Sequence, residues 1–127
     1  MKMYLGDLVS RRKPAIEAFL KKPYSGKITL KLVKFQKEIE KIFQVYEETR
    51  NKLITKYGTE KDGQIKVEKD TEGWFNFIAE INEVYAEEIE VPELDLIIED
   101  LCTDDIKISA EEITLLEDFL KKVENPN

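Results

Sequence analysis

The sequence predicts an α+β fold built around one long helix, and three observations support this prediction. Apolar residues recur at intervals of three and four between residues 29 and 57, which is the spacing of a helix face. Shorter stretches further along alternate between apolar and polar residues, as strands do. A hydrophobic share of 42% in 127 residues is enough for one domain with a core. We therefore expect a single domain over residues 1–127, with the long central helix in an antiparallel helical hairpin, two further helices and a small sheet of short strands.

Charge is divided unevenly along the chain. Residues 1–57 carry 14 Lys/Arg against six Asp/Glu, whereas residues 58–127 carry six against 21. These parts are a basic helical half and an acidic α+β half. The formal net charge of −7 argues against direct binding to nucleic acid. A single cysteine cannot form an internal disulfide, which favours a reducing, intracellular location.

The first predicted helix covers residues 7–22, because its apolar side chains lie at helical spacing. Pro14 lies inside this stretch and lacks the N–H that a helix interior needs. Two arrangements are therefore open. Either the helix is kinked at Pro14, or its regular part begins near Lys13 with the proline in its first turn.

The long helix is expected over residues 29–57, with Gly58 as its C-terminal cap. At about 1.5 Å per residue it would span roughly 42 Å, more than one small domain covers without a neighbouring helix or a partner. Its apolar positions follow a seven-residue repeat for about three heptads. The positions that we expect to be buried are Leu32, Phe35, Ile39, Ile42, Tyr46 and Leu53. A homodimer through this helix is one arrangement that would cover them.

The segments after the long helix alternate between turns, strands and helices. Residues 59–63 are expected to form a polar turn, and residues 64–68 a short strand. A helix over residues 70–86, capped by Asp70 or Thr71, is expected to pack antiparallel against the long helix.

The last third of the chain is expected to complete the sheet and add a final helix. Strands are predicted near residues 88–91 and 94–98, with a short helix as the alternative for the second. Together with residues 64–68 they should form one small sheet. Ser109 and Glu112 match a capping box, which predicts a helix that begins there. Its inward positions would be Ile113, Leu116, Leu120 and Val123.

Several of these segments, taken in order, carry a family resemblance. They are the end of the long helix at Lys56-Tyr57-Gly58, the turn and strand 62–67, the helix around residues 75–82, residues 88–91, and the closing helix from Ser109. In this order they resemble a family of small uncharacterised proteins encoded by phages and prophages of Gram-positive bacteria. The chain departs at its start, where the family opens with an alternating strand and only residues 2–5 could take that place. The resemblance implies a phage origin, a location in the host cytoplasm or the virion, and no catalytic motif.

The acidic stretch from Glu87 to Asp105 is the main candidate site. Carboxylates at regular spacing on a rigid frame can imitate the phosphates of a duplex and occupy the basic cleft of a nucleic-acid enzyme. The alternative, which the sequence favours, is a solvated face that neutralises the protein's own basic helices. The candidate partner-binding residues are Glu87, Glu88, Glu90, Glu93, Asp95, Glu99, Asp100, Asp104 and Asp105.

A basic face in the first half is a second candidate. It could grip phosphates, but it has no interleaved aromatic residues for stacking on bases. A solvated face, or one that docks on the acidic half of a neighbouring copy, is the favoured interpretation. Its members are Arg11, Arg12, Lys13, Lys21, Lys22, Lys27, Lys31 and Lys34.

Catalysis has little support in this sequence. It contains no histidine, glycine-rich phosphate loop, nucleophile elbow or zinc-binding spacing. Neighbouring carboxylates such as Glu99 and Asp100 would point to opposite faces of a strand and could not chelate a metal together. Cys102 is expected to be a half-buried hydrophobe, and Trp74 to belong to the core. We therefore predict a protein that is not an enzyme, with no catalytic residues, cofactor or metal site.

These observations favour a binding protein. We expect a phage-encoded accessory protein that acts by protein–protein binding, with a host or phage protein, or a second copy, as its partner. An acidic inhibitor of a host defence or nucleic-acid-processing complex is the alternative. Membrane association is not expected, because the longest apolar stretches have only about three residues.

Overall fold

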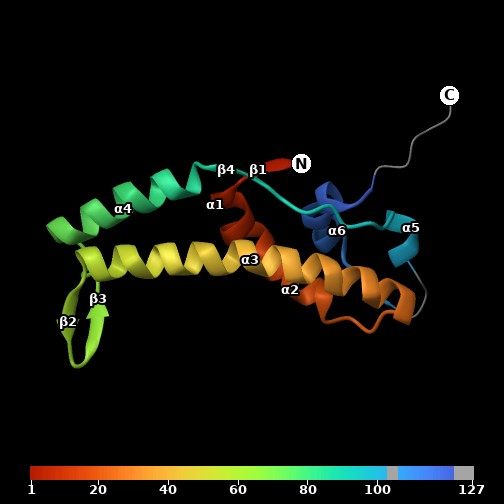
Figure 1. Ribbon diagram of the computed structural model, residues 1–127, viewed down its shortest axis with the longest axis horizontal. Coiled ribbons are helices and arrows are strands. Elements are labelled where there is room, and N and C mark those ends of the chain that lie inside the picture. Colours follow the sequence, from red (N-terminus) through yellow and green to blue (C-terminus); the bar gives the residue numbers. More distant parts are fainter. Residues whose placement is uncertain (103–105, 122–127) are drawn as a thin grey trace.

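A computed structural model describes residues 1–102 and 106–121, and its mixture of helices and short strands confirms the predicted α+β class. The long helix α3 (Gly26–Tyr57) runs along the length of the molecule, and the other elements are arranged along it (Figure 1). The 32 residues of α3 extend for about 48 Å. Different sets of elements lie against its two halves.

The N-terminal segment is a strand followed by consecutive helical turns. The strand β1 (Lys2–Tyr4) leads into α1 (Leu5–Asp7), the π-helical turn η1 (Leu8–Arg12) and α2 (Lys13–Leu20). Helix thus begins earlier than the predicted residue 7. Pro14 lies in the first turn of α2, so the second of the two predicted arrangements is correct. Pro14 has no N–H to donate, and the wider π turn ends at Arg12, directly before α2 begins.

The long helix is confirmed, but its predicted burial is only half correct. The buried side chains of α3 are Leu32, Phe35, Ile39 and Phe43, and none lies beyond Phe43. The predicted core positions Ile42, Tyr46 and Leu53 are half-buried. Ile42 packs at the margin of the core, whereas Tyr46 and Leu53 lie on the part of α3 that has the single helix α4 (Glu72–Tyr85) beside it. One neighbouring helix cannot surround a side chain.

Gly58 ends α3 for a different reason from the one expected. Its φ of −85° is extended and not left-handed, so any residue could adopt this backbone. A Cβ at this position would lie 2.5 Å from the carbonyl oxygen of Ile54 and 2.7 Å from Cγ2 of Ile65. Glycine is needed here because another part of the chain approaches closely.

A β-hairpin follows α3 directly. Strands β2 (Thr59–Lys61) and β3 (Gln64–Lys66) pair antiparallel, with Thr59 opposite Lys66. The prediction of a polar turn over residues 59–63 was therefore too long. Asp62 and Gly63 alone make the turn, both with positive φ, which is the geometry that lets two strands pair across a two-residue connection.

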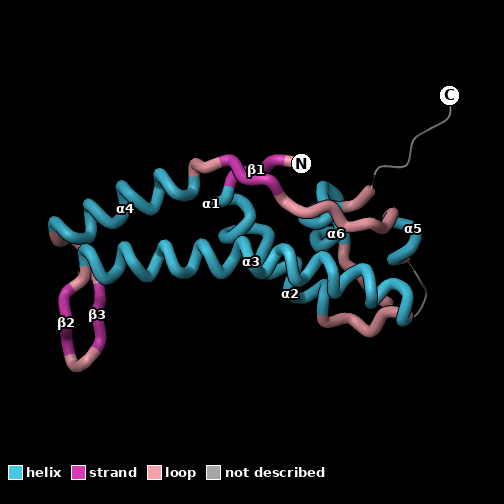
Figure 2. Tube along the Cα trace, viewed as in Figure 1, coloured by secondary structure: helices cyan, strands magenta, loops and turns pink. Residues whose placement is uncertain are grey.

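Helix α4 runs back beside the far half of α3, which confirms the antiparallel helical hairpin (Figure 1). The hydroxyl oxygen of Thr71 accepts a hydrogen bond from the Trp74 N–H at 3.1 Å and caps the helix. Strand β4 (Glu88–Glu90) then pairs antiparallel with β1. The prediction of one small sheet is wrong. The described strands form two separate pairs. The pair β2–β3 lies at the far end of the helical hairpin, and the pair β1–β4 lies near the N-terminus (Figure 2).

The predicted strand over residues 94–98 is also wrong. Leu94 makes only an isolated bridge with Leu120, and residues Ile98–Leu101 form the short helix α5. The Asp100 carboxylate accepts a hydrogen bond from the Ile97 N–H at 3.0 Å, which stabilises a helix start in place of a strand.

The final helix is shorter than expected. Ser109 caps α6 (Ala110–Leu116) by accepting a hydrogen bond from the Glu112 N–H at 3.1 Å, as the capping box predicted. A 3₁₀ turn η2 (Glu117–Phe119) follows. The expected inward position Val123 lies outside the described residues.

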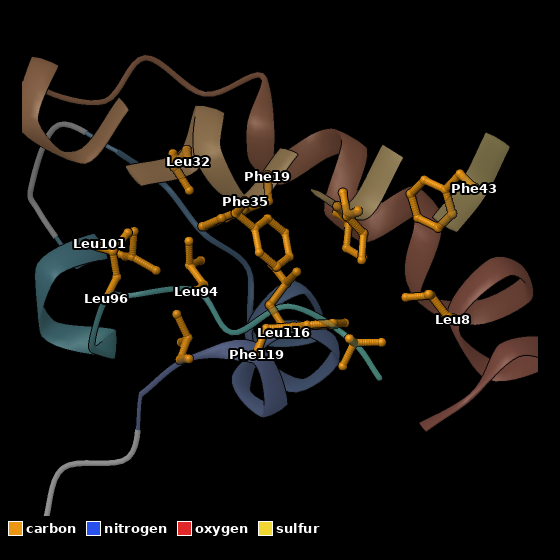
Figure 3. Packing of buried hydrophobic residues seen from close by; sticks show 14 residues of the cluster. Leu8, Phe19, Leu32, Phe35, Phe43, Leu94, Leu96, Leu101, Leu116 and Phe119 are labelled. Atoms are coloured by element: carbon orange, nitrogen blue, oxygen red, sulfur yellow. The ribbon is translucent and has the colours of Figure 1, made fainter. Parts of the chain in front are cut away.

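One apolar core joins these elements and lies against the first half of α3. The rings of Phe35 and Phe119 meet edge to face, with centroids 5.6 Å apart (Figure 3). Every member comes from the N-terminal helices, from α3 up to Phe43, or from the chain after β4. The buried cluster is Leu8, Ile16, Phe19, Leu32, Phe35, Ile39, Phe43, Val91, Leu94, Leu96, Leu101, Leu116, Phe119 and Leu120.

Candidate functional site

The part of the molecule beyond this core is a thin arm. We define the arm as residues 44–57 of α3, the β2–β3 hairpin and α4. Among its residues only Ile81 is buried, at 4% exposure, and the buried core cluster contains no arm residue. Three large apolar side chains of the arm face solvent, since Val45 is 63% exposed, Phe75 is 61% exposed and Ile65 is 43% exposed. Where exposed apolar side chains form a continuous patch, they mark a contact site for another molecule.

An open groove lies at the tip of the arm, between the end of α3, the β-hairpin and the start of α4. Its volume is about 320 Å³. Apolar side chains make up most of the lining, together with two cations and no acidic residue. The lining residues are Arg50, Ile54, Ile65, Lys66, Val67, Trp74 and Phe77.

Close backbone approaches hold this tip together. Gly58 brings the start of the hairpin against Ile65, as described above. Gly73, in the first turn of α4, lies directly against the carbonyl of Tyr57, so that a Cβ would collide with it. The two helices therefore approach each other closely where α3 ends and α4 begins.

At the base of the arm, two tyrosines join α3 to α4. The hydroxyl groups of Tyr46 and Tyr85 lie 2.9 Å apart and share a hydrogen bond. Burial, and then the hydrogen bond with Tyr85, raise the pKa of Tyr46 to about 12. Tyr85 also packs against Gly6, where a Cβ would lie 2.7 Å from the tyrosine Cβ. The arm is thus anchored on the N-terminal helices at this end.

The predicted acidic site is partly neutralised from within the chain. The Asp95 carboxylate pairs with Lys31 at 3.6 Å and with Lys121 at 2.5 Å, and these two ammonium groups lower the pKa of Asp95. Glu90 pairs with the N-terminal ammonium of Met1 at 3.2 Å. Asp100 accepts the hydrogen bond at the start of α5.

The other members of the acidic site face solvent. Glu87, Glu88, Glu93 and Glu99 are exposed, and the structure pairs none of them with a cation among the residues it describes. Asp104 and Asp105 lie outside the described residues. The seven predicted residues that the structure describes are thus not brought together as one cluster, because they follow an extended path through β4, a loop and α5.

Much of the predicted basic face is paired internally. Arg11 and Arg12 both bind the Asp7 carboxylate, each with an N–O distance of 2.6 Å. Lys13 pairs with Glu47 and Lys22 with Glu112, both at 3.4 Å. These carboxylates lie outside the acidic stretch, and the Lys31–Asp95 pair is the one described that joins a member of the basic face to a member of the acidic site. Lys21, Lys27 and Lys34 are exposed.

Two single residues differ from expectation. Cys102 is exposed, where a half-buried position was expected, because α5 ends at Leu101 and leaves the thiol outside the core. Trp74 is half-buried at the tip of the arm and lies outside the core cluster. Within residues 1–102 and 106–121, no group of three or more His, Cys, Asp or Glu side chains is arranged to hold a metal ion. No helix in the same ranges is both long and apolar enough to cross a membrane.

Sequence reasoning missed the groove at the tip. Its lining comes from three separate segments, α3, residues 65–67 and α4, which meet where the chain folds back at the tip of the arm. The one available signal was the Asp62-Gly63 turn, which favours a tight hairpin between the two helices. Comparison with known proteins found no matching family model, no matching curated protein and no matching solved structure.

Proposed function

We propose that this protein is a phage-encoded accessory protein that acts, without catalysis, by binding another protein through the arm. The observation that carries the proposal is the exposure of Phe75 and Ile65 on an arm that contributes nothing to the core cluster. A pair of helices with a hairpin buries one face only, and a partner that covers the other face would remove apolar surface from water. The phage origin, and with it a place in the host cytoplasm or the virion, rests on the resemblance in sequence.

Partner capture with single variants tests the role of the arm. Phe75→Ser changes the arm outside the groove, and Ile65→Ser changes the groove. Leu30→Ser is the matched control, because Leu30 is 59% exposed on the first half of α3, away from the arm. We expect at least one arm variant to recover about tenfold less partner from host and phage lysates than the wild type does, while the control recovers the same amount. Equal recovery by all variants would contradict the proposal.

A second copy of the chain is one such partner. Light scattering distinguishes it, because self-association raises the mass above the 14.9 kDa of one chain. Phe75→Ser would then lower the mass to that of the monomer.

The acidic inhibitor is the second candidate, and the exposure of Glu87, Glu88, Glu93 and Glu99 favours it. Changing these four residues to Gln leaves the internal pairs of Glu90 and Asp95 intact. If the inhibitor proposal is correct, this variant loses the partner, and the wild type loses it steeply between about 50 and 200 mM salt. An arm contact that is mainly apolar is retained over the same range of salt.

A further inference from the structure

We infer that the groove at the tip of the arm binds an acidic segment of the partner protein, with one or two apolar side chains as its anchor. This inference rests on the proposed protein-binding function and adds the chemistry of the partner. The groove volume of about 320 Å³ is at the lower end of sites that hold small ligands, roughly 300–1,000 Å³. An extended peptide that inserts one or two side chains would match this size.

The floor of the groove selects apolar side chains. Ile54 lies in the last turns of α3, Ile65 and Val67 come from the hairpin side, and Trp74 and Phe77 from the first turns of α4. Ile54, Val67, Trp74 and Phe77 are half-buried, and Ile65 is exposed. An incoming Leu, Ile or Phe side chain would bury this surface further and gain the free energy of removing it from water.

The edge of the groove selects negative charge. Arg50 and Lys66 line it, and neither forms an ion pair with a carboxylate that the structure describes. This contrasts with their neighbours, since Lys56 pairs with Glu80 at 3.1 Å and Lys61 with Glu68 at 3.2 Å. In a chain of net charge −7, the groove therefore presents two available cations beside apolar side chains. An acidic ligand is attracted there and a basic one is repelled.

The groove is better suited to a short acidic peptide than to a nucleic acid strand. A strand that ran along α4 beyond the groove would meet Glu72 and Glu83, because this helix carries no Lys or Arg and its third carboxylate, Glu80, is already paired with Lys56. A polyanion is repelled by this helix, whereas a peptide with a few acidic residues can end within the reach of Arg50 and Lys66.

Trp74 is the only tryptophan of the chain, so its fluorescence reports directly on the groove. We would titrate the full chain with three pools of capped hexapeptides that share Leu, Ile, Phe or Met at the two central positions. Their flanking positions are Asp/Glu, Asn/Gln or Lys. We expect the acidic pool to change the Trp74 emission saturably, the neutral pool to bind about 3–10-fold more weakly, and the Lys pool to have no effect.

Charge variants complete the test. Arg50→Gln and Lys66→Gln should each weaken binding of the acidic pool about 3–10-fold. Lys52→Gln is the control, because Lys52 is exposed on α3 and does not line the groove, and it should stay within about twofold of the wild type. Circular dichroism checks that each variant keeps its helices.

Three outcomes would overturn the inference. They are no saturable change with the acidic pool, an equal change with the Lys pool, and tighter binding of an oligothymidine strand than of the acidic peptides. The experiments distinguish failure of this inference from failure of the proposed protein-binding function. If Phe75→Ser loses the partner while Ile65→Ser and the peptides have no effect, the arm binds through another face and only the inference is wrong.

Discussion

At the scale of single residues, Arg12 connects the two ends of the chain. Its guanidinium is buried, at 8% exposure, and binds the carboxylates of Asp7 at 2.6 Å and Asp118 at 2.8 Å. It also donates a hydrogen bond to the Leu115 carbonyl at 3.0 Å. The π turn allows Arg11 and Arg12 to bind the same carboxylate. Arg11 follows Asp7 by four positions and Arg12 by five, and the wider turn brings the fifth residue back over Asp7.

Arg12→Gln should therefore destabilise the protein. The shorter neutral side chain leaves the Leu115 carbonyl and Asp118 without their buried donor, and we expect a loss of about 2–3 kcal/mol in the free energy of unfolding. Urea unfolding followed by circular dichroism measures it. Arg11→Gln is the control and should cost less than about 1 kcal/mol, since Arg11 is 57% exposed. Equal effects of the two variants would show that burial of Arg12 is unimportant.

The stability difference between wild type and the control variant Arg11→Gln should depend on pH. The hydrogen bond from Arg11 is the largest cause that lowers the pKa of Asp7 below its ordinary value of 3.8. A carboxylate with a lowered pKa stabilises the fold above the unfolded pKa, and this contribution is lost as the pH falls through the folded pKa. Wild type and Arg11→Gln should thus differ at pH 5 and converge as the pH falls through the lowered pKa of Asp7 in the folded protein.

Residue partners were the least predictable feature of this sequence. Arg12 was placed on an exposed basic face, and Asp95 in an exposed acidic site, because sequence spacing shows local neighbours only. The partners Asp118 and Lys31 are far away along the chain and meet them only through the packing around the first half of α3. The cap Ser109 was predicted correctly, and Thr71 was one of the two caps considered for α4, because a helix cap depends on the next three residues alone.

At the scale of elements, helices were predictable and strand pairing was not. The periodicity of α3 and α4 extends over many residues and identified both. A strand of three residues is too short to show a clear alternation of apolar and polar residues. The partner of β1 is β4, which is far away along the chain. Residues 94–98 alternate like a strand, but the leucines Leu94 and Leu96 are buried in the core without a neighbouring strand.

Glycine substitutions test how the elements of the arm meet. Gly73→Ala puts a methyl group against the Tyr57 carbonyl and should cost about 1–3 kcal/mol, because backbone on both sides must move. Gly26→Ala is the matched control, since Gly26 begins α3 with open space around its Cα, and it should be neutral or stabilising by up to about 1 kcal/mol. Thermal unfolding by circular dichroism compares them. A neutral Gly73→Ala would contradict the close approach of α3 and α4.

At the scale of the whole molecule, one helix is shared between a core and an arm. The core surrounds α3 up to Phe43, and the remaining part of α3 has α4 and the hairpin as its neighbours (Figure 1). The sequence indicated that the long helix was too long to be covered by one small domain. It did not indicate which half lacks cover, because the apolar repeat continues with equal strength through Tyr46 and Leu53.

Hydrogen exchange along α3, read by NMR or by mass spectrometry of short peptides, tests this division most directly. The free energy needed to open a segment locally is greater where its side chains make more buried apolar contacts. Amides between Leu32 and Phe43 should exchange only by global unfolding, while amides of residues 47–57 and of α4 should exchange much faster, through local opening of the arm. Uniform protection from Leu32 to Tyr57 would contradict this division, because the arm would then be as firmly packed as the core and would need no partner to cover it.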